Sequence, residues 1–453
     1  MKTPPIKRII LVCVGLISFS SLPAQSPLTL GDAVQYALKN SEVLKQAGLD
    51  IEKGYQQVKE TRGAALPQVN VTSAVNNNVL VMQMPLPAEF LGGEPGKFIA
   101  LKAGQPWSAN TQVTLSQQLY NKQVFTGLKA AKSTEDFYRI SHDLTKEDLL
   151  QQVAVNYYQV QISGLQMAVI DANLERVKRL EEMITGQYNN GLAKKIDVDR
   201  VKVNKSNLDA QKLLLENGLK QQLNALKYYM GMPVEEQIEL AVLDPATMQV
   251  APELSASAGQ FGVDNLLSFK VLKKQEELLT LQREATRSEA FPTLSLNGNY
   301  TYNTQNSRLN LYTGKALNYD MATITLNLRV PIFDGFTRRA KVQQNSIAIK
   351  SLQEDIRRTT NALNMNNENA RTKLSNSLRT IEVQRANKDL AQEVFDNVQN
   401  NYRNGLASLT DLLDAESSLV ESQRSLNEAM LQYKIGEIEL LKANGQINTL
   451  LDQ

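Results

Sequence analysis

Few side chains in this chain of 453 residues are suited to catalysis or metal binding. Its only cysteine, Cys13, lies in an N-terminal apolar run, and its only histidine, His142, lies in a segment with the composition of a long helix. One imidazole cannot build a catalytic or metal site that needs two. No nucleophile and base pair, metal cluster or phosphate-binding loop emerges elsewhere, and the charge pattern does not indicate nucleic acid binding. We therefore expect a protein that is not an enzyme and that uses no cofactor and no metal ion.

Two carboxylates near the C-terminus have the spacing of a shared helix face. Asp411 and Asp414 are three residues apart, so both lie on one side of a helix. For Asp411 the sequence also favours a second role, because an acidic residue in the first turn interacts with the helix dipole and completes a cap with Ser408 or Thr410. Asp414 lies deeper in the helix, where capping explains it less well.

The first 24 residues are predicted to be an export signal. An apolar core, Ile9–Ile17, is followed by a small-residue cleavage site at Ala24 and is preceded by basic residues, namely Lys2, Lys7 and Arg8. The core is about half as long as the roughly 20 residues that span a bilayer. Cys13 lies inside the core rather than at its end, which argues against lipidation. Removal of the three basic residues takes the formal charge from +2 to about −1.

Two segments have the composition of very long helices. Proline is absent from 107–232 and from 332–453, and both windows are dense in strong helix formers. Between Gly335 and Gly405 there is neither glycine nor proline. A helix can therefore run there for about 65 residues, or roughly 100 Å at 1.5 Å per residue.

The chain is a tandem duplication. The segments 187–193 and 401–407, which read QYNNGLA and NYRNGLA, are identical at five of seven positions and lie 214 residues apart. The same offset relates Asp197 to Asp411. We expect a first repeat in 25–240, a linker in 241–261 and a second repeat in 262–453, each with a pair of long helices joined at a tip turn, 188–197 in the first and 402–411 in the second.

Each repeat also contains two predicted strands. The hydrophobic period changes from helical to alternating at Pro67 and at Pro292. The strands are expected at about 67–77, 110–120, 292–304 and 320–333, with exposed loops at 84–108 and 304–318.

No run in the exported chain is long enough for a transmembrane helix, so any membrane span must be β. Four strands cannot close a barrel, so several copies must contribute, and the parity rule permits two copies or three.

The whole exported chain resembles the TolC family of outer-membrane efflux proteins. The motifs that carry the resemblance are the strand entries at Pro67 and Pro292 together with Leu28-Thr29-Leu30-Gly31-Asp32-Ala33, Pro331-Ile332-Phe333-Asp334-Gly335 and Asp411-Leu412-Leu413-Asp414-Ala415. The resemblance implies an α+β membrane protein, mostly α, that forms a homotrimer with a 12-stranded β-barrel in the outer membrane. A long α-helical barrel would continue it through the periplasm. The implied partners are outer-membrane lipid, a periplasmic adaptor protein and an inner-membrane pump of the RND or ABC type.

The resemblance also assigns roles at the tips. Two acidic positions that ring the periplasmic entrance in the family match Asp411 and Asp414, and a tyrosine and an aspartate that hold the entrance closed match Tyr402 and Asp197. An arginine that helps to hold the entrance closed in the family is replaced here by Ala407, and Arg403 and Lys194 are candidate substitutes. The first-repeat equivalent of Asp414 is Arg200, so the two tips are expected to differ in charge.

The tip turns also resemble the family's docking site for the adaptor. Glycine at a helix terminus permits a left-handed turn, and an exposed leucine beside it is typical of a contact surface. The alternative is a plain turn whose leucines pack inward. The residues concerned are Gly191, Leu192, Ala193, Gly405, Leu406 and Ala407.

These observations favour a passive exit duct that works with a pump and an adaptor. The alternative is a structural or adhesive envelope protein of long coiled coils without transport activity, which would share the helices but not the four amphipathic strands.

Overall fold

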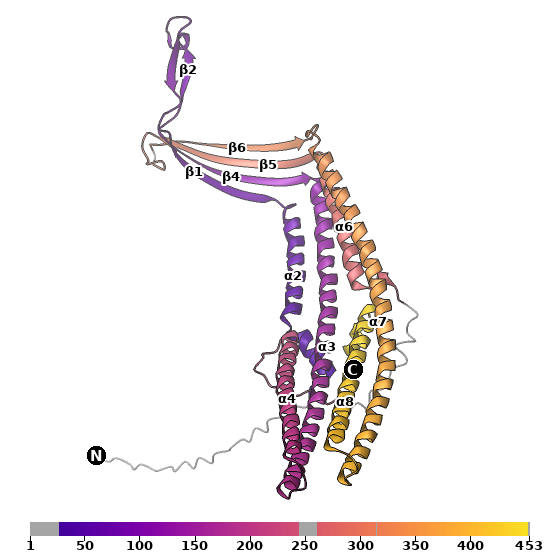
Figure 1. Ribbon diagram of the computed structural model, residues 1–453. Coiled ribbons are helices and arrows are strands. Elements are labelled where there is room, and N and C mark those ends of the chain that lie inside the picture. Colours follow the sequence, from indigo (N-terminus) through magenta and orange to yellow (C-terminus); the bar gives the residue numbers. More distant parts are fainter. Residues whose placement is uncertain (1–26, 244–260, 314, 452–453) are drawn as a thin grey trace, which may run out of the picture.

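The computed structural model describes residues 27–243, 261–313 and 315–451. The predicted signal peptide, 1–24, and most of the predicted linker, 241–261, lie outside the described residues. The described chain forms a long layer of helices and a sheet that extends from one end of that layer (Figure 1).

The helical layer is built around two very long helices. Helix α3 (Lys122–Asn189) has 68 residues and α7 (Thr337–Arg403) has 67, so each is about 100 Å long. The length of α7 follows from its lack of internal glycine and proline. The other helices of the described ranges are α1 (Leu30–Asn40), α2 (Glu42–Gly63), α4 (Lys195–Met230), α6 (Leu267–Ser288) and α8 (Leu409–Ala443), with short 3₁₀ turns η1 (Ala88–Leu91), η3 (Val263–Asn265) and η4 (Ile447–Leu451).

The order of the helices across the layer leaves two of them at the edges. In the half far from the sheet, α3 packs against both α4 and α8, and α8 packs against α7. In the half near the sheet, α2 and α6 take the places of α4 and α8 (Figure 1). The layer therefore has one free edge formed by α2 and α4 and another formed by α7.

The middle of the layer contains the largest buried apolar cluster. Helix α1 and η4 pack there against α3, with fully buried side chains that include Val34, Leu150, Leu226 and Ile447. Among the described residues no helix is both long and apolar enough to cross a membrane.

The sheet has four antiparallel strands in the order β1-β4-β5-β6. They are β1 (Gln68–Asn77), β4 (Trp107–Tyr120), β5 (Thr293–Asn306) and β6 (Leu317–Arg329). The last strand was expected at 320–333 but ends at Arg329. Pro331 explains the early end, because proline has no N–H for the strand ladder.

The register gathers the apolar side chains on one face of the sheet. Val71 lies opposite Val113, Val113 lies opposite Tyr300, and Leu296 lies opposite Leu326. The intervening positions are mostly Asn, Gln, Ser and Thr, so the other face is polar. Both faces of the edge strands β1 and β6 are exposed in one copy of the chain.

The segment expected as an exposed loop at 84–108 contains a hairpin that the sequence did not reveal. Strands β2 (Gln83–Pro87) and β3 (Phe98–Lys102) pair across η1 and project beyond the sheet (Figure 1). The glycine and proline content of the segment concealed these two short strands.

Candidate functional site

The two helix pairs turn at the same end of the molecule, opposite the sheet (Figure 1). Gly191 and Gly405 both have φ of +74°, a left-handed conformation that glycine adopts without strain. The next residue closes each turn, since Leu192 N donates to Gln187 O at 2.8 Å and Leu406 N donates to Asn401 O at 2.8 Å. The backbone turn is therefore the same helix C-cap motif in both repeats.

The leucine of each turn points into solvent. Leu192 is 80% exposed and Leu406 is 78% exposed, whereas Ala193 and Ala407 are half-buried. Inward packing of these leucines, the alternative left open by the sequence, is not what the structure shows for one copy of the chain. Two large apolar side chains are thus presented at the extreme end of the helical layer.

The second turn has a complete cap at the start of α8. Asp411 N donates to Ser408 Oγ at 3.2 Å, and the Asp411 carboxylate accepts from Ser408 N at 2.9 Å and from Ser408 Oγ at 2.7 Å. These hydrogen bonds hold the pKa of Asp411 below its ordinary value. Asp411 is therefore a capping residue that also remains exposed.

Asp414 carries its charge without such support. Its side chain is exposed, and within the described part of the chain its carboxylate makes no hydrogen bond or ion pair. Its neighbours Leu412 and Ala415 are buried and set the orientation of α8, so Asp414 lies on the solvent-exposed side of that helix near the tip.

The first turn is capped less completely. Its N-cap is Lys194, whose side chain cannot accept a hydrogen bond. Lys194 N donates to the Asp197 carboxylate at 3.3 Å, and Asp197 N donates to the backbone oxygen Lys194 O at 3.0 Å rather than to a side chain. The nearby residues Lys195 and Arg200 add positive charge where the second tip has Leu409 and Asp414. The two turns share a backbone and differ in charge.

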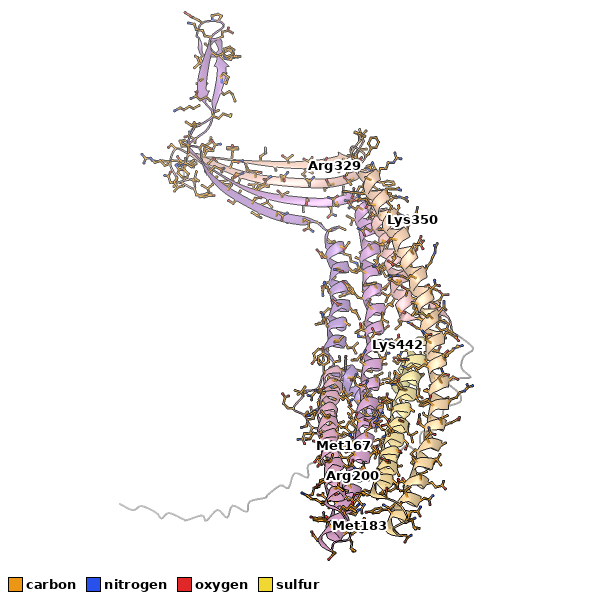
Figure 2. The ribbon with its side chains drawn as sticks, viewed as in Figure 1. Met167, Met183, Arg200, Arg329, Lys350 and Lys442 are labelled. Carbon is orange, nitrogen blue, oxygen red and sulfur yellow. The ribbon has the colours of Figure 1, made fainter. Side chains whose placement is uncertain are left out.

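A hydrogen bond joins the two tips. Arg200 Nη1 donates to Thr410 Oγ1 at 2.9 Å, and Figure 2 shows Arg200 in the lower part of the helical layer, near the start of α4. The sequence offered Arg403 and Lys194 as substitutes for the closing arginine that is Ala407 in this chain. Neither side chain makes a hydrogen bond or ion pair among the described residues. Tyr402 packs against the apolar cluster beneath the tips, and burial and then the negative charge of Asp197 raise its pKa.

An ion pair lies beneath the tips. Arg176 Nε of α3 lies 3.5 Å from Glu416 Oε1 of α8, and Glu416 is only 3% exposed. Burial raises the pKa of Glu416 and the guanidinium of Arg176 opposes that rise. The apolar cluster around this pair includes Val177, Val201 and Leu419. No sequence signal separated Glu416 from the exposed acids around it.

The described residues contain no group of three or more His, Cys, Asp or Glu side chains that could hold a metal ion. The chemistry available at the tips is therefore that of exposed carboxylates, exposed leucines and hydrogen bonds between turns.

Comparisons with known proteins agree with this architecture. A sequence model for the family described as outer membrane efflux protein matches residues 33–232 and 265–446. The outer membrane protein TolC of Vibrio cholerae is 22% identical over 423 residues, which cover 92% of this chain and 91% of that protein. The crystal structure of the outer membrane protein VceC from Vibrio cholerae has a TM-score of 0.70 at 15% identity, over 92% of this chain and 96% of that one. The CmeC outer membrane channel of Campylobacter jejuni has a TM-score of 0.71 at 15% identity, over 98% of this chain and 94% of that one.

Proposed function

The chain belongs to the outer membrane efflux protein family, and from that membership we propose that three copies form a passive duct through which a pump expels its substrates. The expected fold class, mostly α with a TolC-like architecture, is confirmed. The protein is located in the outer membrane and has a large helical domain in the periplasm. The trimer, the adaptor, the pump and the roles of the tip residues are the parts of the function that we propose.

The observation that carries the proposal is that the helical layer has two free edges, one at α2 and α4 and the other at α7. Duplication relates α3 to α7 and α4 to α8, so the α3–α8 contact inside one copy corresponds to an α7–α4 contact. One copy cannot make that second contact, because α4 and α7 lie at opposite edges of its layer. A neighbouring copy supplies it, and repetition around an axis closes the ring.

The two edges carry matching apolar side chains. Val203 of α4 and Val394 of α7 lie eight and nine residues from their tips, or about 12 to 14 Å, and are 61% and 46% exposed. Leu213 of α4 and Val383 of α7 lie about 27 to 30 Å from the tips and are 61% and 57% exposed. Apolar side chains at equal heights on two free edges support a side-by-side contact between copies.

The sheet supports the same assembly. Strands β1 and β6 end the sheet with unpaired backbone groups, and an open edge in hydrocarbon costs several kcal/mol for each unsatisfied group. Pairing of β1 with β6 of the next copy removes both edges. Three copies, the number that the family implies, give a barrel of twelve strands with its apolar face toward lipid.

The tips then surround the periplasmic entrance. Threefold repetition of Asp411 and Asp414 concentrates carboxylates around a narrow axis, which disfavours anions. The Arg200–Thr410 hydrogen bond joins the tips of one copy. We assign the resting closure of the entrance to this bond and to Asp197 and Tyr402, which match the closing residues of the family. Leu192 and Leu406, with the turns that present them, form the docking surface for the periplasmic adaptor.

Electrophysiology of the purified protein tests the proposal. A trimer that dissociates on heating and conducts ions in planar bilayers is the expected result. A stable monomer without conductance would contradict it and would favour the structural or adhesive coiled-coil protein instead. The pump, of the RND or ABC type, is tested by co-purification with the inner-membrane proteins of the same cell.

A further inference from the structure

A surface patch of apolar side chains and arginines lies where β6 passes into α7. Ile332, Phe333 and Phe336 are 91%, 73% and 65% exposed. They line a surface hollow of about 430 Å³ together with three arginines. In Figure 2 the ribbon that joins β6 to α7 runs between the labelled residues Arg329 and Lys350. We call these six residues the junction patch: Arg287, Ile332, Phe333, Phe336, Arg338 and Arg339.

The aromatic part of the patch has a constrained conformation. Phe336 has φ of +66°, and it is the one residue other than glycine with positive φ in the described ranges. Such a conformation is unfavourable for a bulky side chain, so the surrounding turn must impose it. Phe333 packs edge-on against Phe336 with ring centroids 5.4 Å apart. The turn thus holds two rings together and in solvent, which is a poor arrangement for a surface that meets only water.

The arginines give the patch a positive charge. Arg338 Nη1 lies 3.6 Å from Asp334 Oδ2, so its charge is compensated. Arg287 and Arg339 are exposed and make no ion pair with any described residue. Two uncompensated guanidinium groups beside three exposed apolar side chains match a ligand with an anionic head and an apolar body.

The position of the patch indicates the source of that ligand. Ile324, Leu326 and Leu328 belong to the apolar face of β6, and the same alternation continues in the sequence to Ile332. If that face meets the lipid chains, as the proposed function has it, the patch lies where the hydrocarbon ends. Arginines and aromatic rings at that depth interact with lipid headgroups.

We propose that the junction patch is a binding site for an anionic phospholipid in the leaflet that faces the helical domain. Arg287 and Arg339 bind the phosphate group, and Ile332, Phe333 and Phe336 lie against the upper acyl chains. This inference rests on the proposed function, because it needs the sheet to lie in the membrane. The competing occupant is a neighbouring copy, since β6 and α7 are also free edges.

Lipid titration tests the arginines. The assembled protein is titrated with phosphatidylglycerol and with phosphatidylcholine, and bound lipids are counted by native mass spectrometry. Loss of two arginine contacts in Arg287→Gln/Arg339→Gln should weaken phosphatidylglycerol binding by roughly thirtyfold. The matched control, Arg329→Gln/Lys350→Gln, removes the same charge from the polar sheet face and from a lower turn of α7. An equal loss in the control, or full displacement of the lipid by inorganic phosphate, would overturn the proposal.

Fluorescence quenching tests the aromatic side chains. Trp107 is the only tryptophan, so Phe333→Trp in a Trp107→Phe background reports from the patch alone. Brominated phospholipid should quench this tryptophan strongly. Absence of quenching in a trimer that still conducts would overturn the lipid site and indicate contact with a neighbouring copy. Absence of both trimer and conductance in the unmodified protein would instead contradict the proposed function.

Discussion

The two helical tips have the same backbone and opposite chemistry. Both turn through a left-handed glycine and present an exposed leucine. The second tip has a full cap and two carboxylates, whereas the first has a partial cap at Lys194 and the positive charge of Arg200. Duplication preserved what the fold needs and left the charged positions free to diverge. The difference between the tips is therefore the place to look for selectivity and closure.

The two repeats also differ in charge beneath the tips. Arg176 and Glu416 form a buried ion pair between α3 and α8. The equivalent positions in the other repeat are Leu390 and Lys202, which are exposed on the two free edges. The contact inside one copy is thus partly ionic, and the proposed contact between copies is apolar at Leu390.

The largest expected effect comes from removal of one partner of that ion pair. Arg176→Met leaves the Glu416 carboxylate buried without a counter-charge, which should cost about 3 to 5 kcal/mol. We expect a large fall in the thermal midpoint of the helical domain, measured by circular dichroism. The matched control is Arg179→Met, an exposed arginine on the same helix that makes no ion pair with a described residue. Equal effects in both variants would show that the pair contributes nothing beyond the helix itself.

The pH dependence of the Arg176→Met variant sharpens this test. Burial raises the pKa of Glu416 above its unfolded value, so the folded state binds the proton more tightly than the unfolded state does. The stability of the variant should therefore rise as the pH falls from neutral toward the ordinary pKa of a glutamate, and should be lost again as the pH rises. A flat profile would contradict the assignment to Glu416.

A smaller effect is expected from breaking the bond between the tips. Arg200→Ala removes the hydrogen bond to Thr410, worth about 1 kcal/mol at an exposed site, or about fivefold in the ratio of closed to open entrances. The open probability in single-channel recordings should rise, while Lys202→Ala, which removes a nearby exposed charge without that bond, should leave it unchanged. If Arg200→Ala also has no effect, the closure does not depend on this contact.

The sequence predicted most of the architecture because that information is local and periodic. The absence of glycine and proline predicted the length of α7, and alternation after Pro67 and Pro292 predicted where two of the strands begin. The end of β6 was placed too late because the apolar alternation continues past Pro331, which cannot join the ladder.

The site was predicted less completely because its contacts join segments far apart in the chain. The sequence identified Arg200 as the counterpart of Asp414, but not its bond to Thr410, which depends on how α4 and α8 pack. The sequence did not single out Glu416, and only the tertiary position of Arg176 distinguishes it from the exposed acids nearby. Periodicity locates a residue on a face, and the packing of the helices decides what covers that face.

Removal of a carboxylate at the second tip distinguishes its role in ion selectivity from its role in capping the helix. Asp414→Asn should lower cation preference in bilayers and leave the helix intact, because the Asp414 side chain makes no hydrogen bond or ion pair with a described residue. Asp411→Ala should lower cation preference as well, but should also destabilise the first turn of α8 by about 1 kcal/mol through loss of the cap. Reversal potentials measure the first effect and amide hydrogen exchange the second. Unchanged selectivity in both variants would mean that these carboxylates lie away from the path of the ions.

The smallest effect is expected from making the first tip resemble the second. Lys194→Ser supplies the hydroxyl that the partial cap lacks, so that Asp197 N can donate to it, as Asp411 N donates to Ser408 Oγ, instead of to the backbone oxygen of residue 194. The gain should be about 0.5 to 1 kcal/mol and confined to the first turn of α4. Hydrogen exchange at the amides of Asp197 and Val198 should slow, with Lys195→Ser as a control for loss of charge. If both variants slow exchange equally, charge repulsion rather than the missing hydroxyl sets the difference between the tips.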